Sequence, residues 1–168
     1  MTAYKELCKA FFTELPRREA IDRMLRELPA KMAQAISDYL AAPSGYVEPC
    51  KTAIDRVGRR TWQRCEDDCL QADSDGVYGF CISVRAEYDP GSLNHSIMYF
   101  AFSVEDFDEQ SIQLRIKNLD GKISIADAHD PASYANAAKA TIERLVSNLK
   151  NPKATSGSRA PIGFVSQP

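Results

Sequence analysis

The sequence predicts an α+β fold with N-terminal helices, a four-stranded antiparallel β-meander and a C-terminal helix packed on the sheet. Residues 77–126 contain four runs in which apolar and polar side chains alternate, as they do in β-strands. Residues 3–40 and 131–150 instead place apolar side chains three or four positions apart, which is the period of an α-helix.

The N-terminal region is expected to form three helices. Leu7, Phe11 and Leu15 recur at a spacing of four, so they share one face of the first helix. Pro16 should end the first helix, and Pro29 should break or kink the second, because proline lacks a backbone donor and disfavours the α region in the preceding residue. The expected helices are 3–15, 17–28 and 29–40.

Residues 46–72 fit two structures. Apolar and cysteine side chains from Cys50 to Cys69 recur at a spacing of three or four, which favours a helix to about Arg60. Gly58 lies inside that pattern and costs a helix about 1 kcal/mol. Thr61–Cys65 fits a short additional strand equally well, so this part stays open.

The first two strands of the expected meander are Val77–Tyr88 and Ser96–Glu105. The first has one apolar face, whereas the second is apolar on both faces and should be central. Residues 89–92, with the sequence Asp-Pro-Gly-Ser, should form a tight turn between them.

The last two strands, Ser111–Lys117 and about 122–126, should form a hairpin. Asp120-Gly121 suits a two-residue turn, since both of its positions favour a positive φ. Such a turn places Ile116 opposite Ile125, and the apolar faces of the two strands then meet.

The C-terminal helix should begin at Pro131, with Asp130 as its cap, and run to Lys150. Its apolar stripe should pack on the sheet. The expected core residues are Tyr78, Phe80, Ile82, Met98, Phe100, Phe102, Leu114, Ile116, Ile125, Ile142, Leu145 and Leu149.

Composition favours one domain, residues 1–150, followed by a disordered tail at 151–168 that has few bulky apolar side chains. No apolar run approaches the roughly 20 residues of a membrane span, so we expect no membrane contact. The N-terminus lacks a signal-peptide core, and the 5 cysteines show no regular spacing. We therefore expect reduced thiols and a cytoplasmic location.

No catalytic or cofactor signature is present. The sequence has no glycine-rich phosphate loop, dinucleotide fingerprint, His-Glu-x-x-His motif or Gly-x-Ser-x-Gly motif. His95 and His129 are isolated, and surface or capping roles suit them better than acid–base catalysis. We lean towards a protein that is not an enzyme, and we assign it no catalytic residue and no cofactor.

Two clusters offer alternative chemistry. Cys65 and Cys69 would share a helix face and could hold a metal, but a second ligand pair is missing, so all five thiols are expected to be free. The basic patch holds four arginines beside Trp62, which we expect to be anchored in the core; the pI of about 5.7 makes nucleic acid an improbable partner. The four arginines are Arg56, Arg59, Arg60 and Arg64.

Acidic residues are concentrated in the middle of the chain, where residues 61–130 hold 14 Asp and Glu against 5 Lys and Arg. Helices docking on a sheet of complementary charge explain this pattern most simply. Head-to-tail self-association, which would make a homo-oligomer, is the alternative interpretation, as is a basic partner.

The second face of the predicted meander is mostly polar. Its alternation places Arg85, Tyr99, Arg115 and Lys117 there, and tyrosine and arginine are enriched at protein-binding hot spots. We therefore predict that these four residues contribute to a partner site. The alternative is that the N-terminal helices cover this face.

The sequence thus favours a small cytoplasmic binding or adaptor protein that acts through protein–protein contacts without catalysis. One alternative is a ligand-binding or hydrolytic protein with a pocket between helices and sheet. Another is a metal or thiol protein organised around Cys65 and Cys69.

Overall fold

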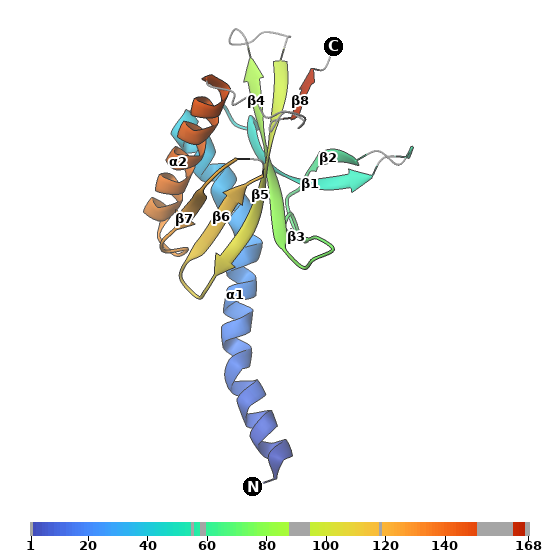
Figure 1. Cartoon of the computed structure of the whole chain (residues 1–168), viewed down its shortest axis with the longest axis vertical. Helices are drawn as coiled ribbons and strands as arrows, with labels where there is room; N and C mark the ends of the chain where they lie inside the picture. Colours follow the sequence, from blue (N-terminus) through green and yellow to red (C-terminus); the bar gives the residue numbers. More distant parts are fainter. Residues whose placement is uncertain are drawn as a thin grey trace.

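The computed structural model describes residues 2–54, 56–57, 60–87, 95–117, 119–150 and 163–166, and the side chains of 52–54, 60 and 163–166 are outside the description. It confirms the α+β class, with an N-terminal helix, an antiparallel sheet and a C-terminal helix (Figure 1). The elements are α1 (Ala3–Leu40), β1 (Val47–Ile54), β2 (Arg60–Arg64), β3 (Gln71–Ala72), β4 (Tyr78–Glu87), β5 (His95–Phe107), β6 (Ile112–Ile116), β7 (Lys122–Ile125), α2 (Pro131–Lys150) and β8 (Gly163–Ser166).

The predicted meander is the centre of a larger sheet. Strands β4 to β7 are consecutive antiparallel neighbours, within the order β2-β1-β4-β5-β6-β7. Strand β3 pairs with β4, and β8 pairs with the part of β5 that β6 does not reach. Four strands are therefore too few, because β1 occupies the edge of β4 that the sequence pattern left unpaired. The turn predicted at residues 89–92 lies outside the described residues.

The register of the last hairpin differs from the prediction. Ile125 lies opposite Ile112, four positions from the expected partner Ile116, and Ile116 instead lies opposite Phe102. Leu119 donates its backbone N–H to the Ile116 carbonyl at 3.1 Å, so a wider turn replaces the two-residue one. A shift by an even number keeps each side chain on its face, so the apolar pattern alone could not distinguish the two registers.

Helix α1 runs through both prolines, so the prediction of three helices is wrong. Pro29 is fully buried among the core residues of α1, and this packing offsets the lost backbone hydrogen bond. Pro16 lies on the exposed part of the helix, where Arg17 next to it forms ion pairs with Glu14 and with Glu109.

The helix favoured for residues 46–60 is also wrong, since β1 and the start of β2 occupy this region. The alternative strand at Thr61–Cys65 matches β2 closely. Strand β1 pairs with the edge of β4, from Val47 opposite Val84 to Cys50 opposite Cys81. Such long-range pairing overrides the helical spacing of a few apolar residues.

The core lies between one face of the sheet and the two helices. The side chains of α1 that enter it run from Met24 to Ile36, and those of α2 include Leu145. Phe80 and Phe102 stack across β4 and β5 with ring centroids 4.9 Å apart. Of the predicted core residues, Met98 and Ile142 are half-buried and only Tyr78 and Leu149 are exposed.

Helix α2 begins and ends where the sequence predicts. Asp130 accepts a hydrogen bond from the Ala132 N–H at 3.0 Å, as a cap should. Within the expected tail, Gly163–Ser166 forms β8, which differs from the disorder expected there, and residues 151–162 lie outside the described residues. Among the described helices, none is long and apolar enough to cross a membrane.

Candidate protein-binding surfaces

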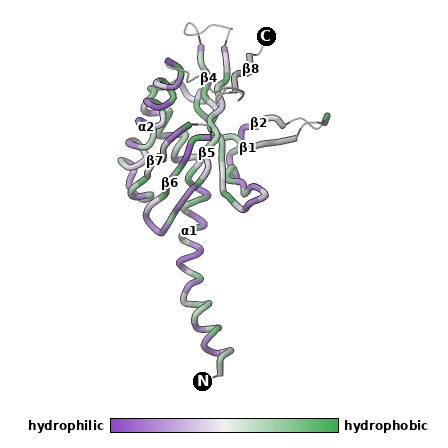
Figure 2. Tube along the Cα trace, in the orientation of Figure 1, coloured by the Kyte–Doolittle hydropathy of each residue, from purple (hydrophilic) through white to green (hydrophobic). Residues whose placement is uncertain are grey.

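The N-terminal half of α1 extends beyond the folded body (Figure 1). We call residues 3–20 the projecting segment. Tyr4, Leu7, Phe11 and Phe12 are 74%, 69%, 52% and 67% exposed, and continuous burial of the helix begins only after Ile21. Apolar positions therefore recur along a segment that the described body does not cover (Figure 2).

The exposed apolar stripe continues the face that α1 packs on the sheet. Leu7 precedes the half-buried Ile21 by 14 residues, and Phe11 precedes the buried Leu25 by the same interval. At 3.6 residues per turn, such pairs lie within about 40° of each other around the helix axis. The face of α1 that contacts the sheet thus extends into solvent.

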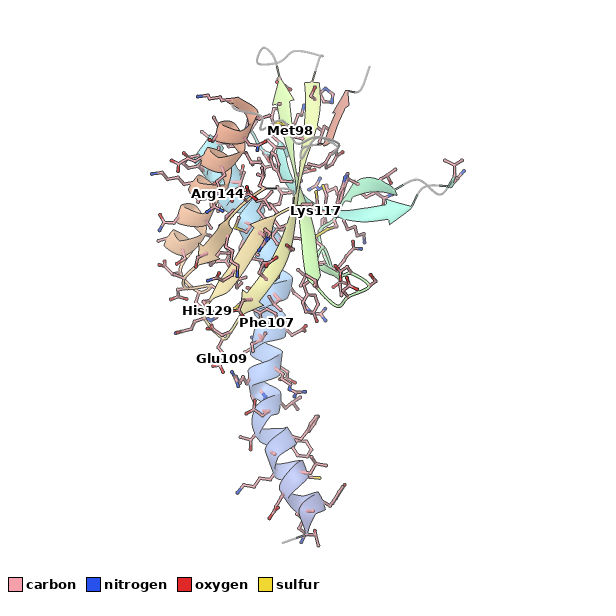
Figure 3. All side chains as sticks on the ribbon, in the orientation of Figure 1. Met98, Phe107, Glu109, Lys117, His129 and Arg144 are labelled. Carbon is pink, nitrogen blue, oxygen red and sulfur yellow. A yellow bond between two sulfur atoms is a disulfide. The ribbon has the colours of Figure 1, made fainter. Side chains whose placement is uncertain are left out.

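The helical state of the projecting segment needs an explanation beyond its own sequence. An isolated helix of about 18 residues is marginal in water. Pro16 also removes one backbone hydrogen bond, which costs an interior helix about 3 kcal/mol. The Arg17–Glu109 ion pair holds the segment to the body only at its base, where Figure 3 shows Glu109 beside α1.

The base of the projecting segment adjoins a polar hollow of about 450 Å³ formed by Arg17, residues 108–110 and His129. The Asp108 carboxylate accepts the backbone N–H groups of Gln110 and Ser111 at 2.7 and 2.6 Å. These bonds hold the pKa of Asp108 below its usual value. The hollow therefore keeps an ionised carboxylate at the point where α1 leaves the body.

The sheet's second face is not covered by either helix, since the helices share the opposite face with the core. Tyr99 lies on this face, where Trp62 of β2 stacks on it with centroids 5.9 Å apart and planes 20° apart. Trp62 stays 37% exposed, so the expectation that it is anchored in the core is wrong. Burial raises the pKa of Tyr99 above its ordinary value.

Arg85 is held by neighbours on the same face. Its guanidinium lies 3.0 Å from the Glu87 carboxylate and 5.0 Å from the centre of the Tyr46 ring. The Tyr46 hydroxyl donates to Glu87 at 2.6 Å, which raises the pKa of Tyr46. Arg85 therefore has partners within the chain, and its Nε is buried without a hydrogen-bond partner among the described residues.

The four predicted site residues do not form one compact cluster. Arg85 lies opposite Ile97 and Arg115 lies opposite Ser103, which separates them by about 20 Å along β5. Arg115 pairs with Glu105 at 3.2 Å, and Lys117 is exposed just after β6. Tyr99 lies between these two ends of the face.

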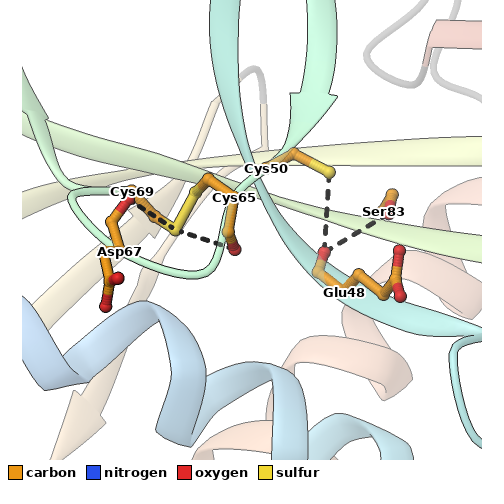
Figure 4. The surroundings of a disulfide bond; sticks show 6 residues. All are labelled: Glu48, Cys50, Cys65, Asp67, Cys69 and Ser83. Carbon is orange, nitrogen blue, oxygen red and sulfur yellow. Dashed lines mark hydrogen bonds between the residues drawn. A yellow bond between two sulfur atoms is a disulfide. The ribbon is translucent and has the colours of Figure 1, made fainter.

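The cysteines depart from the prediction of five free thiols. Cys65 and Cys69 form a disulfide with Cα atoms 5.8 Å apart (Figure 4). Cys8, Cys50 and Cys81 are free. The intervening residues include Asp68, which contacts Arg26 of α1 at 3.3 Å. The disulfide thus stabilises a short loop beside the buried part of α1. The spacing of the two cysteines could not reveal the bond, because it was interpreted as a shared helix face. Cys65 instead follows β2 and lies opposite Pro49.

Cys50 and Cys81 lie opposite each other on the second face, and both are buried. Burial raises the pKa of both thiols, which disfavours their reactive thiolate forms. Within the described residues, no group of three or more His, Cys, Asp or Glu side chains is arranged to hold a metal ion.

A second hollow of about 460 Å³ lies between α1 and α2, and its wall is mostly apolar. Tyr134 contributes to the wall, and the ammonium of Lys31 lies 5.7 Å from the centre of its ring. The buried Tyr134 hydroxyl has no hydrogen-bond partner in the described part of the chain. His129 adjoins this hollow as well as the polar one, and its backbone N–H donates to the Asp127 carboxylate at 2.8 Å.

The fold and these surfaces define an α+β protein with a projecting helix. No protein-family model matches the chain, and searches of curated proteins and of solved structures also find no match.

Sequence reasoning missed the projecting segment as a surface. Leu7, Phe11 and Leu15 were expected to share one face of the first helix, and no contact was predicted for that face. The available signal was the 14-residue interval that links Leu7 to Ile21 and Phe11 to Leu25 across Pro16. That interval indicates one continuous helix with one apolar face, although it does not show where the body ends.

Proposed function

We propose that this protein binds another protein chain through the projecting segment. The exposure of four bulky apolar side chains on one uncovered helical stretch carries this proposal. Each aromatic ring that leaves water buries on the order of 150–250 Å², at about 25 cal/mol per Å². An amphipathic helix that fills an apolar groove, or pairs with another helix, is a common mode of protein recognition.

A binding or adaptor role without catalysis suits this arrangement. The body supplies a fixed platform, because residues 24–36 of α1 are locked into the core, and the projecting segment supplies the contact. A cytoplasmic location remains part of the proposal. It no longer draws support from the cysteines, since disulfides such as Cys65–Cys69 persist best in oxidising compartments.

The test compares what the chain retains when it is purified from its host. Leu7→Ser with Phe11→Ser removes the apolar stripe, whereas Thr13→Ala alters the opposite side of the same helix and serves as the control. We expect the double variant to lose at least one protein that the wild type and the control retain at equal amounts, and a co-expressed second copy of this chain with a different tag counts among the retained proteins. Identical sets of retained proteins in all three samples would contradict the proposal.

Melting temperatures accompany this comparison. Leu7 and Phe11 are exposed and contact no described core residue, so the double variant should melt within a few degrees of the wild type. If the double variant loses binding but keeps its melting temperature, the loss of binding is caused by the altered surface and not by unfolding.

We propose the second face of the sheet as an additional contact surface, with Tyr99 at its centre, Arg115 and Lys117 at one end and Arg85 at the other. The exposed edge of the Trp62–Tyr99 stack supports this assignment, because amphipathic rings beside cations are typical of binding hot spots. The ion pair with Glu87 and the contact with the Tyr46 ring make Arg85 a positioning residue for this surface.

The apolar hollow between α1 and α2 supports a second candidate function, the binding of a small ligand. Its volume of about 460 Å³ lies in the range of ligand pockets, and its mostly apolar wall suits an aromatic or aliphatic molecule. An apolar environment-sensitive dye such as ANS tests this function. Saturable dye binding that Ala35→Trp abolishes would support it, whereas binding unchanged by that substitution would contradict it.

A further inference from the structure

We infer that the partner of the projecting segment is the same segment of a second copy of this chain, paired antiparallel about Phe11. This inference deepens the proposed function and rests on it. It commits to one occupant for the exposed stripe and to one arrangement of the two copies.

The spacing of the stripe is symmetric, as pairing between identical chains requires. A two-fold axis brings residue i of one copy against residue j of the other and repeats the contact in reverse. Leu7 and Leu15 lie four residues on either side of Phe11. An axis through Phe11 therefore stacks the two Phe11 rings and sets Leu7 of each copy against Leu15 of the other.

The ends of the segment are also complementary under this axis. Tyr4 and Arg18 lie seven residues on either side of Phe11, so each tyrosine ring meets a guanidinium of the other copy. Such cation–π contacts are favourable. Lys5 of one copy lies level with Arg17 of the other copy, whose Asp108 and Glu109 supply carboxylates there.

The position of the body excludes the parallel arrangement. The exposed stripe continues the side of α1 that packs on the sheet, so two parallel helices joined through it would place both bodies in the same space. In the antiparallel arrangement, residue 3 of one copy lies beside residue 19 of the other. Figure 1 shows the body at one end of the projecting segment, so in this arrangement each body begins just past the N-terminal end of the opposing helix.

The length and area of the contact fit a reversible dimer. The projecting segment is about 27 Å long, from 18 residues at 1.5 Å each. Covering the exposed Tyr4, Leu7 and Phe11, together with the half-buried Leu15, in both copies removes on the order of 1,000 Å² from water. That area lies near the lower limit for a specific interface, so the mass should depend on concentration.

Sedimentation equilibrium of the full chain tests the dimer. We expect a monomer–dimer equilibrium for the wild type and for Thr13→Ala, and a monomer for Leu7→Ser with Phe11→Ser. The inference is overturned if the wild type sediments as a monomer at every concentration, or if the double variant associates as strongly as the wild type.

Cysteine cross-linking tests the antiparallel register, in a background where Cys8 is replaced by serine. We expect a mixture of a Tyr4→Cys copy and an Arg18→Cys copy to form a disulfide-linked pair on mild oxidation, and each variant alone to remain unlinked. Parallel pairing predicts the reverse, with self-linking of each variant alone, and that result would overturn the inference.

These outcomes separate the two proposals. If the wild type is monomeric and Leu7→Ser with Phe11→Ser still releases a protein retained from the host, the proposed function stands and the dimer is wrong. If the wild type is monomeric and the substitutions release nothing, both are wrong.

Discussion

Trp62 and Tyr99 stack on each other although their strands, β2 and β5, are separated in the sheet by β1 and β4. This contact requires the β1–β2 hairpin to bend over the second face of the sheet (Figure 1). The bend gives that face a small apolar layer of its own, beneath which Cys50 and Cys81 are buried. The face therefore combines a covered centre with a polar, cationic margin.

Substitutions on the second face of the sheet, around the Trp62–Tyr99 stack, should leave the protein folded. Tyr99→Ala with Arg115→Glu removes one aromatic pair worth about 1 kcal/mol and one exposed ion pair worth still less. We expect a lower melting temperature by a few degrees and the loss of a protein retained from the host. Lys139→Glu, on the exposed side of α2, makes a comparable charge change and should lose nothing.

Retention of every host protein by the Tyr99→Ala, Arg115→Glu variant would show that this face is structural. Unfolding of the same variant would lead to the same conclusion, because the face would then be part of what holds the sheet together.

Phe100 should be among the most sensitive core positions. It is buried in β5 among residues of β4 and the helices, so Phe100→Ala should lower the free energy of unfolding by about 3–5 kcal/mol. Phe12→Ala removes the same ring from an exposed position and is the matched control. Chemical denaturation of both variants tests this prediction. Equal denaturation midpoints for Phe100→Ala and Phe12→Ala would refute the core assignment.

The Cys65–Cys69 disulfide predicts the number of thiols that can be titrated. Under denaturing, non-reducing conditions three thiols should titrate, from Cys8, Cys50 and Cys81, and five should titrate after reduction. Replacing both Cys65 and Cys69 by alanine should lower the free energy of unfolding by about 2 kcal/mol, the value expected for so short a loop. Five titratable thiols before reduction would mean that the bond is absent.

Tyr134 should make stability fall at alkaline pH. Burial raises its pKa to about 12, with smaller contributions from Glu27 and Asp127. Because the folded-state pKa lies above the unfolded value of about 10, this stabilisation is complete below pH 10 and is lost as the pH rises to 12. The loss should amount to roughly 2–3 kcal/mol.

Tyr134→Phe isolates this effect from other groups that titrate in the same range, including Tyr46 and Cys50. At neutral pH the variant should be at least as stable as the wild type, since it removes a buried hydroxyl that lacks a partner. Between pH 10 and 12 it should lose less stability than the wild type. Parallel curves for the two proteins would rule out the Tyr134 contribution.

The elements that the sequence predicted correctly have strong local signals. Alternation defined β4 to β7 to within two residues, and the Asp130-Pro131 cap placed the start of α2. The errors arise where contacts between distant parts of the chain determine the secondary structure. Burial of Pro29 keeps α1 continuous, and pairing with β4 turns residues 47–54 into a strand.

The candidate surfaces were harder to predict than the fold. Alternation placed Tyr99 and Arg115 on the correct face, but the distance between Arg85 and Arg115 depends on the register of β5 with both neighbours. The projecting segment was missed because an apolar stripe looks the same whether the chain's own core or another protein covers it. Only the position of the body distinguishes the two cases.

Hydrogen exchange of the amides in residues 5–20 tests the central claim most directly. The measurement compares the wild type with Leu7→Ser, Phe11→Ser, each with the proteins it retains from its host, and uses α2 as the internal reference. A covered projecting segment predicts slow exchange in the wild type, fast exchange in the variant and equal protection of α2 in both. Fast exchange of residues 5–20 in the wild type, at the rate seen in the variant, would contradict the claim that this segment is a protein contact.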